Sequence, residues 1–445
     1  MPHADERVAD EPEVDGRGAD DAALRAAAVA VLTANRRGAS TVPAPGLYPY
    51  QWCWDTGPIS LGWAAAGDWE QAWSELRTLL SAQWPNGFVP HIVFWELSDD
   101  YFPGPDVWGT VGLGAPGGPP TTGITQPPLP VSAAAALFAA DPDRARAARE
   151  LDGLWPHLVA WVTWLGRARR GPHGAVVAVH PWETGMDNSP AWDDPLRSTP
   201  ESTHTHLERR DVRTVAADER PTTVEYRHYL GIVAALRDAG WDTEQQVEAS
   251  PFAVEDVGFT AIAARAAADL AAAASELGHD ADAAQLSTLA ASWRDGIAAL
   301  WDVDHAWYRA YDVRAATFVG PATAGGLLAL WAGAADAARA AQLVARIEAW
   351  SSGTLRAVPT TDPDAAEFDP IRYWRGPVWV LVNYLVAEGL RGSAHDDLAA
   401  QVRSGTRALV ARDGFCEYFD PRDGHGIGGE GFSWSAALTL WWLLS

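Results

Sequence analysis

The acidic residue with the most informative surroundings is Asp187, which lies in the segment HPWETGMDNSPAWDD (180–194). Its Gly-Met-Asp-Asn-Ser-Pro centre cannot lie inside a helix, because glycine and Pro190 impose a turn there. Trp182 and Trp192 flank this turn. Apolar surroundings raise the pKa of a carboxyl group, as a general acid requires. A structural turn rich in Asp and Asn is the alternative, and an isolated Asp-Asn-Ser-Pro string favours it.

A second acidic residue, Glu417, lies in the segment DGFCEYFDP (413–421). The alternation in this segment allows a strand that places Glu417 on the same face as Phe415 and Phe419. A carboxylate on an apolar face is costly unless it is paired or functional. The segment therefore predicts either an ion pair with an arginine such as Arg375 or a catalytic carboxylate.

Two carboxyl groups on either side of a glycosidic bond are the groups that most glycosidases use. In the inverting route, one carboxyl protonates the leaving oxygen while the other activates a water molecule on the opposite face, and the two stand ~6.5–9.5 Å apart. Asp187 and Glu417 are the candidates for these roles. A third acid, Asp55, follows two tryptophans in YPYQWCWDTGP (48–58). Its spacing favours a helix N-cap, and the functional alternative is binding of sugar hydroxyls.

Two arginines lie in segments that could bind an anion or orient a sugar. Arg375 lies in RYWRGPVW (372–379), next to aromatic residues and before a predicted helix. Arg220 precedes another predicted helix that carries Tyr226 in its first turns. A guanidinium and a phenol at this spacing could hold an anionic aglycone. On spacing alone, a solvated surface charge is favoured for Arg220.

The composition predicts a folded protein with flat apolar surfaces. The chain has 445 residues, 48% of them hydrophobic, and 24 are tryptophans. Tryptophan combines a flat apolar face with a polar handle, so this abundance favours either carbohydrate binding or a tryptophan-rich helical core. The formal net charge is -25, and lysine is absent. This acidic balance disfavours nucleic acid and anionic membranes as partners.

The sequence predicts neither a metal nor a cofactor. His204 and His206 share a polar loop with no third ligand nearby, and the sequence has no P-loop. Two cysteines, Cys53 and Cys416, form no disulfide framework, and the start of the chain lacks the apolar stretch of a secretory signal. We therefore expect a cytoplasmic protein. No apolar run reaches the ~18 residues of a membrane span. The oligomeric state stays open, and a homo-oligomer is compatible with the sequence.

Alanine- and leucine-rich segments with helical spacing alternate with long loops rich in Trp, Tyr, Pro, Gly and Asp. This alternation predicts one all-α domain, a helical toroid, over residues 21–445, after a flexible acidic tail at 1–20. Loop insertions are expected near 96–130 and 193–223, and the best strand candidate is 174–180. The predicted helices are 19–36, 57–66, 68–82, 131–149, 151–169, 224–239, 254–277, 279–301, 323–332, 334–350, 376–390, 393–411 and 432–444.

Taken in order, the loop motifs resemble glycoside hydrolase family 63, and most closely its bacterial glucosylglycerate and mannosylglycerate hydrolase branch. The resemblance runs from about Tyr48 to the C-terminus, so it covers most of the chain. The motifs that carry it are YPYQWCWD, LLSAQWPNGFVPHIVF, YFPGP, GITQPP, WETGMDNSPAWD, FAVEDV, YWRGPVW, CEYFDP and FSWSAA.

The resemblance implies an (α/α)6 barrel whose long loops form a lid over the active site, and a reaction with inversion. It assigns the general acid to Asp187 and the general base to Glu417. It implies that Arg220 and Tyr226 contact a glycerate, and Arg375 and Trp434 are further substrate-binding candidates. The residues that it implies around the sugar are Tyr48, Trp52, Asp55, Tyr101, Gln126, Trp182, Tyr373 and Trp374.

One position departs from the family pattern. Phe432 stands where the glycerate hydrolases carry a glutamine that helps to bind glycerate, and phenylalanine cannot replace that hydrogen bond. Loss of one charge-assisted bond weakens binding by ~1.5–3 kcal/mol. The expected function is an inverting α-glycosidase of a small glucosyl or mannosyl conjugate such as glucosylglycerate. The alternatives are an α-glucosidase acting on a neutral disaccharide or glucosylglycerol, a non-catalytic sugar-binding toroid and a terpene-cyclase-like toroid.

Overall fold

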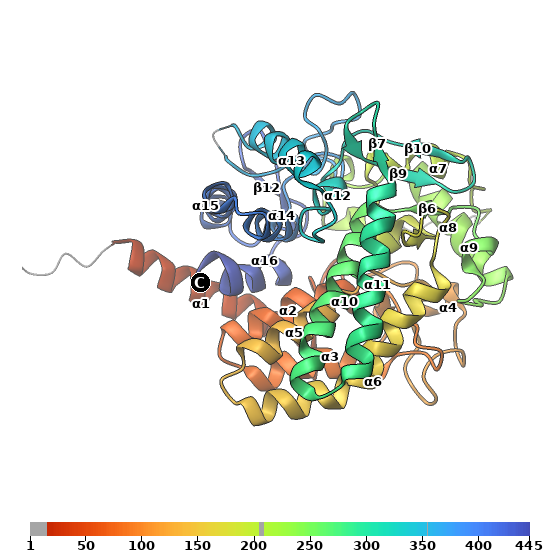
Figure 1. Ribbon diagram of the computed structural model, residues 1–445, viewed down its shortest axis with the longest axis horizontal. Helices are drawn as coiled ribbons and strands as arrows, with labels where there is room; N and C mark the ends of the chain where they lie inside the picture. Colours follow the sequence, from red (N-terminus) through yellow and green to blue (C-terminus); the bar gives the residue numbers. More distant parts are fainter. Residues whose placement is uncertain (1–15, 204–208, 354) are drawn as a thin grey trace, which may run out of the picture.

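The computed structural model describes residues 16–203, 209–353 and 355–445 (Figure 1). The first fifteen residues of the predicted acidic tail, and His204 and His206, lie outside the described residues. Helix α1 (Gly16–Asn35) begins inside the segment that the sequence assigned to a tail ending at residue 20. It starts three residues before the predicted helix 19–36.

The described part of the chain is mostly helical, and its long helices pack in two layers (Figure 1). An inner helix is typically followed along the chain by an outer helix that packs on it, as α10 is by α11 and α14 by α15. Neighbouring inner helices also touch, α2 with α5 and α16, and α5 with α10. The inner helices are α2 (Cys53–Ala65), α5 (Leu129–Ala140), α10 (Val257–Leu277), α14 (Val380–Gly392) and α16 (Ser433–Leu438). Their outer partners are α1, α3 (Trp69–Ser81), α6 (Arg144–Ala168), α11 (Asp280–Ala299) and α15 (Asp396–Asp413).

The pattern of buried residues explains which layer a helix joins. In α11 the buried residues Leu286, Ala290, Trp293 and Ile297 recur every three or four positions, which is one apolar face. By contrast, α10 is buried around most of its circumference. It is also long and apolar enough to cross a membrane by length and composition, although 78% of the relevant window is buried inside the protein. We take it as the central core helix.

Three predicted helices differ strongly in extent from the observed ones. The predicted helices 131–149 and 151–169 were divided at the wrong place, because α5 ends at Ala140 and α6 runs without a break from Arg144 to Ala168. The Asp143 carboxylate caps α6 by accepting a hydrogen bond from the backbone N–H of Arg146 at 3.0 Å. The predicted helix 323–332 is reduced to α12 (Ala324–Leu327) followed by turns. The other described α-helices are α4 (Pro105–Trp108), α7 (Asp193–Arg197), α8 (Thr223–Asp238), α9 (Gln246–Ala249) and α13 (Ala337–Trp350), and a π-helical turn (Thr439–Leu443) follows α16.

The strands are two or three residues long and brace the loops rather than form a layer. The predicted strand 174–180 is confirmed as β5 (Val177–Ala178), at one edge of an antiparallel sheet ordered β10-β9-β6-β5. Its other strands are β6 (Val254–Glu255), β9 (Ala310–Asp312) and β10 (Thr317–Val319). The two-stranded pairs are β1 (Arg36–Arg37) with β2 (Ser40–Thr41), β3 (Gln51–Trp52) with β4 (Ile92–Val93), β7 (Trp301–Asp302) with β8 (Trp307–Tyr308), and β11 (Tyr418–Phe419) with β12 (Gly426–Ile427).

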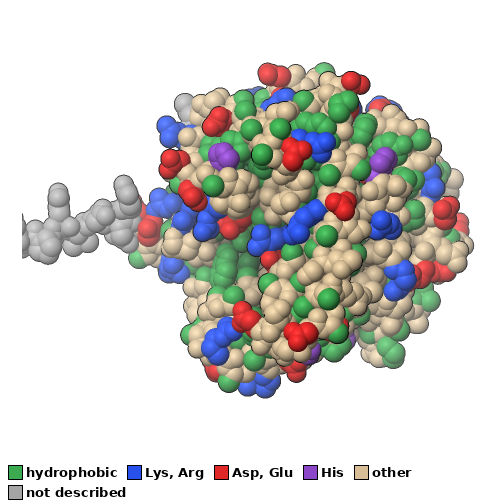
Figure 2. All heavy atoms as spheres, in the orientation of Figure 1, with side chains coloured by type: hydrophobic (Ala, Val, Ile, Leu, Met, Phe, Trp, Pro, Cys, Tyr) green, Lys and Arg blue, Asp and Glu red, His purple; other side chains and the backbone are tan. Residues whose placement is uncertain are grey.

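The surface charge is mixed on the face shown in Figure 2, where acidic and basic side chains are interspersed. No broad basic field for a polyanion appears on that face. The abundant tryptophans lie in two kinds of place. Some, such as Trp73, Trp161 and Trp293, are fully buried among the helices. Others line a chamber at the loop end of the fold.

Candidate active site

Loops from both halves of the chain enclose a chamber that holds both predicted catalytic acids. Its cavity volume is about 50 Å³, room for only a small number of water molecules. Tyr101 and Phe102 come from the predicted insertion 96–130, and Asp211 and Arg220 come from 193–223. The main lining residues are Tyr48, Trp52, Trp54, Asp55, His91, Tyr101, Gln126, Trp182, Gly185, Asp187, Asp211, Arg220, Tyr226, Tyr373, Trp374, Trp379, Glu417, Phe432 and Trp434.

Asp187 is presented by a tight turn after a short 3₁₀ helix (Pro181–Thr184). That helix ends at Gly185, whose φ is +75°, and an added Cβ would lie 2.4 Å from the Trp54 ring. Only glycine therefore allows the turn to pack against Trp54. The Tyr229 hydroxyl donates to the Asp187 carbonyl at 3.0 Å and fixes the turn from the opposite side.

The pKa of the Asp187 carboxyl is raised to about 8, chiefly because burial penalises its charged form. The nearby Glu417 carboxylate raises it further, whereas Arg220 and a hydrogen bond from Tyr373 lower it. At neutral pH this carboxyl therefore carries a proton. An acid framed by tryptophans, as the sequence indicates, thus has the protonation state that a general acid needs.

Glu417 is fully buried and is held by contacts to both carboxylate oxygens. Its Oε1 accepts a hydrogen bond from the Tyr48 hydroxyl at 2.8 Å, and its Oε2 accepts one from the Gly429 N–H at 3.0 Å. Burial raises the pKa of Glu417, and Arg220, Gly429 and Tyr48 lower it, because they stabilise the carboxylate. The predicted strand was too long, since β11 begins only at Tyr418.

The ion pair that the sequence suggested for Glu417 is made by a different arginine. Arg220 Nη1 lies 3.4 Å from each of its oxygens. Arg375 instead forms a two-pronged ion pair with Asp193, at 2.7 and 2.8 Å. Arg375 is not among the residues that line the chamber. Its Nη1 also reaches the Asn188 carbonyl at 3.4 Å, so it fastens the loop after Asp187 to the 372–375 loop.

Tyr373 connects the two acids in cooperation with Tyr48. The two hydroxyls lie 3.0 Å apart, and Tyr373 also forms the hydrogen bond that lowers the pKa of Asp187. The backbone of Tyr373 has a φ of +44°, which is unusual for a residue other than glycine. Neighbouring bonds hold it there: Trp379 Nε1 donates to the Tyr373 carbonyl at 3.0 Å, and the next N–H, of Trp374, donates to Asn188 Oδ1 at 3.0 Å.

Aromatic side chains form the remaining walls at the sugar end. Trp52 lies at the junction of β3 and α2, and its ring meets those of Tyr48 and Tyr101 edge-on, with centroids 5.2 Å apart in each pair. Trp374 stacks on Trp379 with centroids 3.6 Å apart. Gln126 Oε1 accepts the N–H of Trp54 at 3.2 Å, which joins the 110–130 loop to α2. These rings supply flat apolar faces of the kind that sugar C–H groups contact.

Asp55 does not cap α2, contrary to its spacing. The helix already begins at Cys53, so Asp55 lies in its first turn with its side chain buried. Burial raises the pKa of Asp55 well above its usual value, and Glu417 and Asp187 raise it further. Asp55 therefore shares the chamber with Asp187, Asp211 and Glu417.

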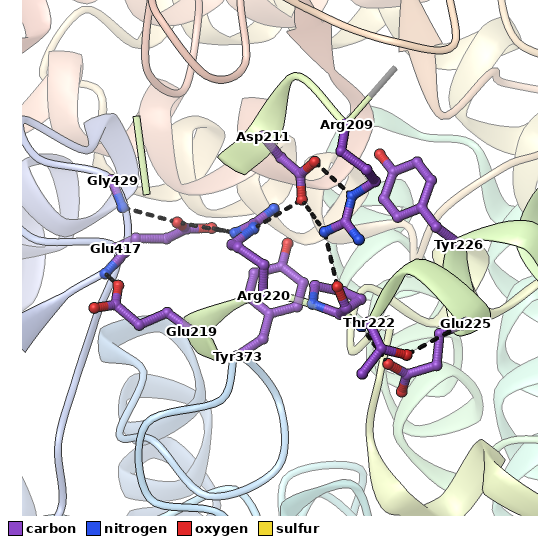
Figure 3. A network of polar contacts seen from close by, with 12 residues as sticks. Arg209, Asp211, Glu219, Arg220, Thr222, Glu225, Tyr226, Tyr373, Glu417 and Gly429 are labelled. Carbon is purple, nitrogen blue, oxygen red and sulfur yellow. Dashed lines mark hydrogen bonds and ion pairs between the residues drawn. The ribbon is translucent and has the colours of Figure 1, made fainter. Parts of the chain in front are cut away.

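Arg220 is buried, which corrects the surface position favoured by its spacing; its side chain is 5% exposed. As Figure 3 shows, it lies between Glu417 and Asp211, and its guanidinium carbon lies 4.1 Å from the centroid of the Tyr373 ring. Its Nη2 donates to the Tyr48 hydroxyl at 2.7 Å, and its Nε lies 3.5 Å from Asp211.

The chain around Arg220 is anchored at both ends. Asp211 accepts two hydrogen bonds from Arg209, at 2.9 and 2.7 Å, and Arg209 also donates to the Pro221 carbonyl at 2.7 Å. A capping box of Thr222 and Glu225 begins α8 immediately afterwards. Tyr226, in the first turn of α8, lines the chamber and donates to the Phe102 carbonyl at 3.2 Å.

Phe432 lies against the aromatic wall where the family pattern has glutamine. It is 2% exposed, and its ring lies 5.8 Å from Tyr48 and 5.0 Å from Trp434, between centroids. It therefore supports Tyr48 by packing and offers the chamber an apolar edge.

Behind the chamber, a buried ion pair fixes the Asp187 loop. Arg169 and Glu183 are both fully buried, 3.1 Å apart. Glu183 also accepts the N–H groups of Thr125 at 3.0 Å and Val179 at 2.8 Å. This one carboxylate thus joins the loop that carries Gln126 to the loop that carries Asp187.

Some lining residues were not among the predicted site residues. Trp54 and Trp379 lie in motifs that pointed to the site, so an aromatic-rich signal was present. His91 also lies in such a motif, LLSAQWPNGFVPHIVF. Its ring stacks on Trp182, and burial lowers the pKa of His91 well below its usual value. Asp211 gave no signal, because its importance depends on Arg209 and Arg220 in space.

Comparison with known proteins was consistent across sequence and structure. The model of the mannosylglycerate hydrolase MGH1-like glycoside hydrolase domain matches residues 48–435. Mannosylglycerate hydrolase of Thermus thermophilus is 47% identical and covers 93% of this chain and 99% of its own. Glucosylglycerate hydrolase of Mycolicibacterium hassiacum is 34% identical, and the match covers 94% of this chain and 97% of that protein. A crystal structure of family 63 mannosylglycerate hydrolase from T. thermophilus with Tris and D-glycerate is 46% identical, covers 94% and 99%, and superposes with a TM-score of 0.88.

Proposed function

The chain belongs to the family of mannosylglycerate hydrolase MGH1-like glycoside hydrolases, and on that premise we propose that it hydrolyses a small α-linked glycosyl conjugate with inversion. Its membership confirms the resemblance to family 63 and makes it a glycoside hydrolase. We assign the general acid to Asp187 and the general base to Glu417. The fold is proposed to be the (α/α)6 barrel of the family, with the 96–130 and 193–223 insertions as its lid.

The observation that carries the assignment is the contrast between these two carboxyl groups in one closed chamber. The pKa of Asp187 is raised to about 8, so this group holds a proton to give. Burial also raises the pKa of Glu417, but three donors, Arg220, Gly429 and Tyr48, favour the carboxylate form that can receive a proton. Because the closed chamber largely excludes water, it strengthens both the burial effect on Asp187 and the interactions of the donors with Glu417.

The proposed reaction balances between these groups. Glu417 takes a proton from a water molecule as the water oxygen forms a bond to the anomeric carbon. The bond from that carbon to the aglycone oxygen breaks, and Asp187 gives its proton to the leaving oxygen. Trp52, Asp55, Gln126 and Trp182 are proposed to hold the sugar in the position that this attack requires.

We propose a glycerate as aglycone and mannose or glucose as the sugar. Relatives with this activity cover almost the whole chain, and one solved relative holds D-glycerate. Arg220 and Tyr226 supply a cation and a phenol in the chamber wall that suit an anionic aglycone. Because the cysteines of the described residues are free, we also propose that the protein works in a reducing cytoplasm.

Phe432 favours a second candidate, hydrolysis of a neutral conjugate such as glucosylglycerol. Phe432 cannot form the hydrogen bond that the family's glutamine gives to glycerate. Binding of the sugar itself does not depend on that hydrogen bond. To decide, mannosylglycerate, glucosylglycerate, glucosylglycerol and trehalose should be compared by kcat/KM. We expect a glycerate conjugate to be the preferred substrate. Preference for glucosylglycerol would support the second candidate.

A further inference from the structure

Arg220 interacts with the base that the proposed reaction needs to be free. Its Nη1 lies 3.4 Å from both oxygens of Glu417 (Figure 3). The other two oxygen contacts of Glu417, from Tyr48 and Gly429, hold the carboxylate in place. A carboxylate facing a guanidinium is a weaker base, because the positive charge stabilises its ionised form.

The contact between Arg220 and Glu417 is also a loose one. Charge-assisted bonds between nitrogen and a carboxylate are usually about 2.7–2.9 Å long. At 3.4 Å, Arg220 provides charge to Glu417 without a close two-pronged bond. A substrate carboxylate that forms a close two-pronged bond with Arg220 therefore binds this guanidinium more strongly than Glu417 does.

Arg220 is tethered on its far side, so it can turn without leaving the chamber. Its Nε lies 3.5 Å from Asp211, and Asp211 is itself held by two bonds from Arg209. The chamber is narrow, with a cavity volume of about 50 Å³. Arg220 is the cation of its wall.

Taking the proposed function as given, we propose that the acid group of an anionic aglycone activates the enzyme by drawing Arg220 from Glu417 to itself. Negative charge on the substrate is then a condition for catalysis, as well as a source of binding energy. Freed from its cation, Glu417 takes the proton of the attacking water more readily. Atoms and charges balance as in the proposed hydrolysis, because Arg220 keeps all its protons and only changes its partner.

The two possible roles of Arg220, binding the aglycone and restraining Glu417, have different effects on KM and kcat. If Arg220 only binds the aglycone, a substrate without the carboxylate should mainly lose affinity. If Arg220 also restrains Glu417, such a substrate should bind and then react slowly. The two effects can be separated with a substrate that has no aglycone at all.

The test uses α-mannosyl fluoride or α-glucosyl fluoride, whichever the wild-type protein accepts, with D-glycerate added separately. Fluoride leaves as an anion without needing a proton from Asp187, so the rate reports on attack by the base-activated water. We expect D-glycerate to raise kcat by roughly tenfold, the effect of one charge-assisted hydrogen bond. Glycerol, which has hydroxyls but no charge, should leave the rate unchanged.

Two variants complete the design. Arg220→Ala should hydrolyse the fluoride at pH 8.5 as fast without D-glycerate as the wild type does with it, and it should not respond to D-glycerate. Arg372→Gln removes a nearby arginine that is paired with Asp369 and should respond as the wild type does. The wild-type comparison alone decides the matter if Arg220→Ala does not fold.

The outcomes separate the inference from the proposed function. If the glycerate conjugate is hydrolysed but D-glycerate inhibits or does not change fluoride hydrolysis, the proposed function stands and the activation by charge is wrong. If the fluoride is hydrolysed but neither glycerate conjugate is, and D-glycerate does not bind in calorimetry, the aglycone assignment fails and the inference fails with it.

Discussion

The hydroxyl of Tyr48 lies 3.0 Å from the hydroxyl of Tyr373, and these two phenols connect the base of the site to its acid. Tyr48 donates to Glu417 at 2.8 Å, and Tyr373 forms a hydrogen bond that lowers the pKa of Asp187. A change in the protonation of either carboxyl group therefore alters the hydrogen bonds of Tyr48 and Tyr373, and through them the pKa of the other carboxyl group. The first prediction follows from these hydrogen bonds.

Replacing Tyr48 with phenylalanine removes a donor that stabilises the ionised form of Glu417. The pKa of Glu417 should rise, so the acidic limb of kcat/KM should move to higher pH. Tyr50→Phe is the matched control, because the Tyr50 hydroxyl bonds to the Ser98 carbonyl instead. A Tyr48→Phe profile that overlays the wild-type profile would argue against Glu417 as the base.

The wild-type pH profile should be bell-shaped. Glu417 must be ionised, so activity falls as the pH drops through its pKa, which burial raises above 4.5. Asp187 must be protonated, so activity falls as the pH rises through about 8. The two apparent values belong to the coupled pair. Kinetics of a glycerate conjugate from pH 4 to 9.5 would measure both limbs.

The roles of the acids can be separated with a good leaving group. Asp187→Asn should lose activity on the conjugate by about 10²–10⁴-fold, the usual contribution of acid–base catalysis, but it should retain activity on the glycosyl fluoride. The alkaline limb should be absent from the fluoride profiles of both the variant and the wild type, because fluoride leaves without a proton from Asp187. Glu417→Gln should lose activity on both substrates. Equal losses of Asp187→Asn on both substrates would contradict the assignment.

Phe432→Gln should improve recognition of glycerate. A glutamine there can donate to the aglycone, so KM for the glycerate conjugate should fall by roughly tenfold. KM for glucosylglycerol should change less, because its aglycone is uncharged. Loss of the Phe432 packing against Tyr48 will lower the melting temperature slightly, which calorimetry would reveal. An unchanged ratio of the two KM values would place the aglycone elsewhere.

Arg169→Met should destabilise the protein strongly, because it leaves Glu183 buried without its cation. Breaking such a pair costs about 3–5 kcal/mol. Arg167→Met, in the last turn of the helix that Arg169 follows, is the matched control, since its ion pair with Glu244 is exposed to solvent and is worth at most about 1 kcal/mol. Denaturant unfolding of both variants would measure the difference. Equal stabilities would mean that Glu183 finds another partner.

The sequence predicted the parts of the site whose signal is local. Aromatic neighbours in the chain made Asp187 and Glu417 candidates, the family resemblance assigned their roles, and the structure places both in one chamber. Most helices were also predicted within a few residues, because their apolar periodicity is strong. The break at Asp141 was missed, since alanine-rich segments on both sides obscure a short turn.

Contacts between distant loops could not be predicted in the same way. Arg375 has three aromatic residues close to it in the sequence and Arg220 has only Tyr226, yet Arg220 reaches Glu417 and Arg375 pairs with Asp193. The choice depends on where the 193–223 insertion folds back over the chamber. Asp55 was misjudged for a related reason, because the start of α2 is fixed by pairing of β3 with β4 and not by a capping side chain.

The central claim, attack by a water molecule that Glu417 activates on the face opposite Asp187, is tested most directly by the anomer released first. Hydrolysis of mannosylglycerate or glucosylglycerate should be followed by proton NMR within the first minutes, before the free sugar mutarotates. The account predicts that the β-anomer appears first from the α-linked substrate. Initial release of the α-anomer would indicate a retaining route and contradict the roles assigned to Asp187 and Glu417.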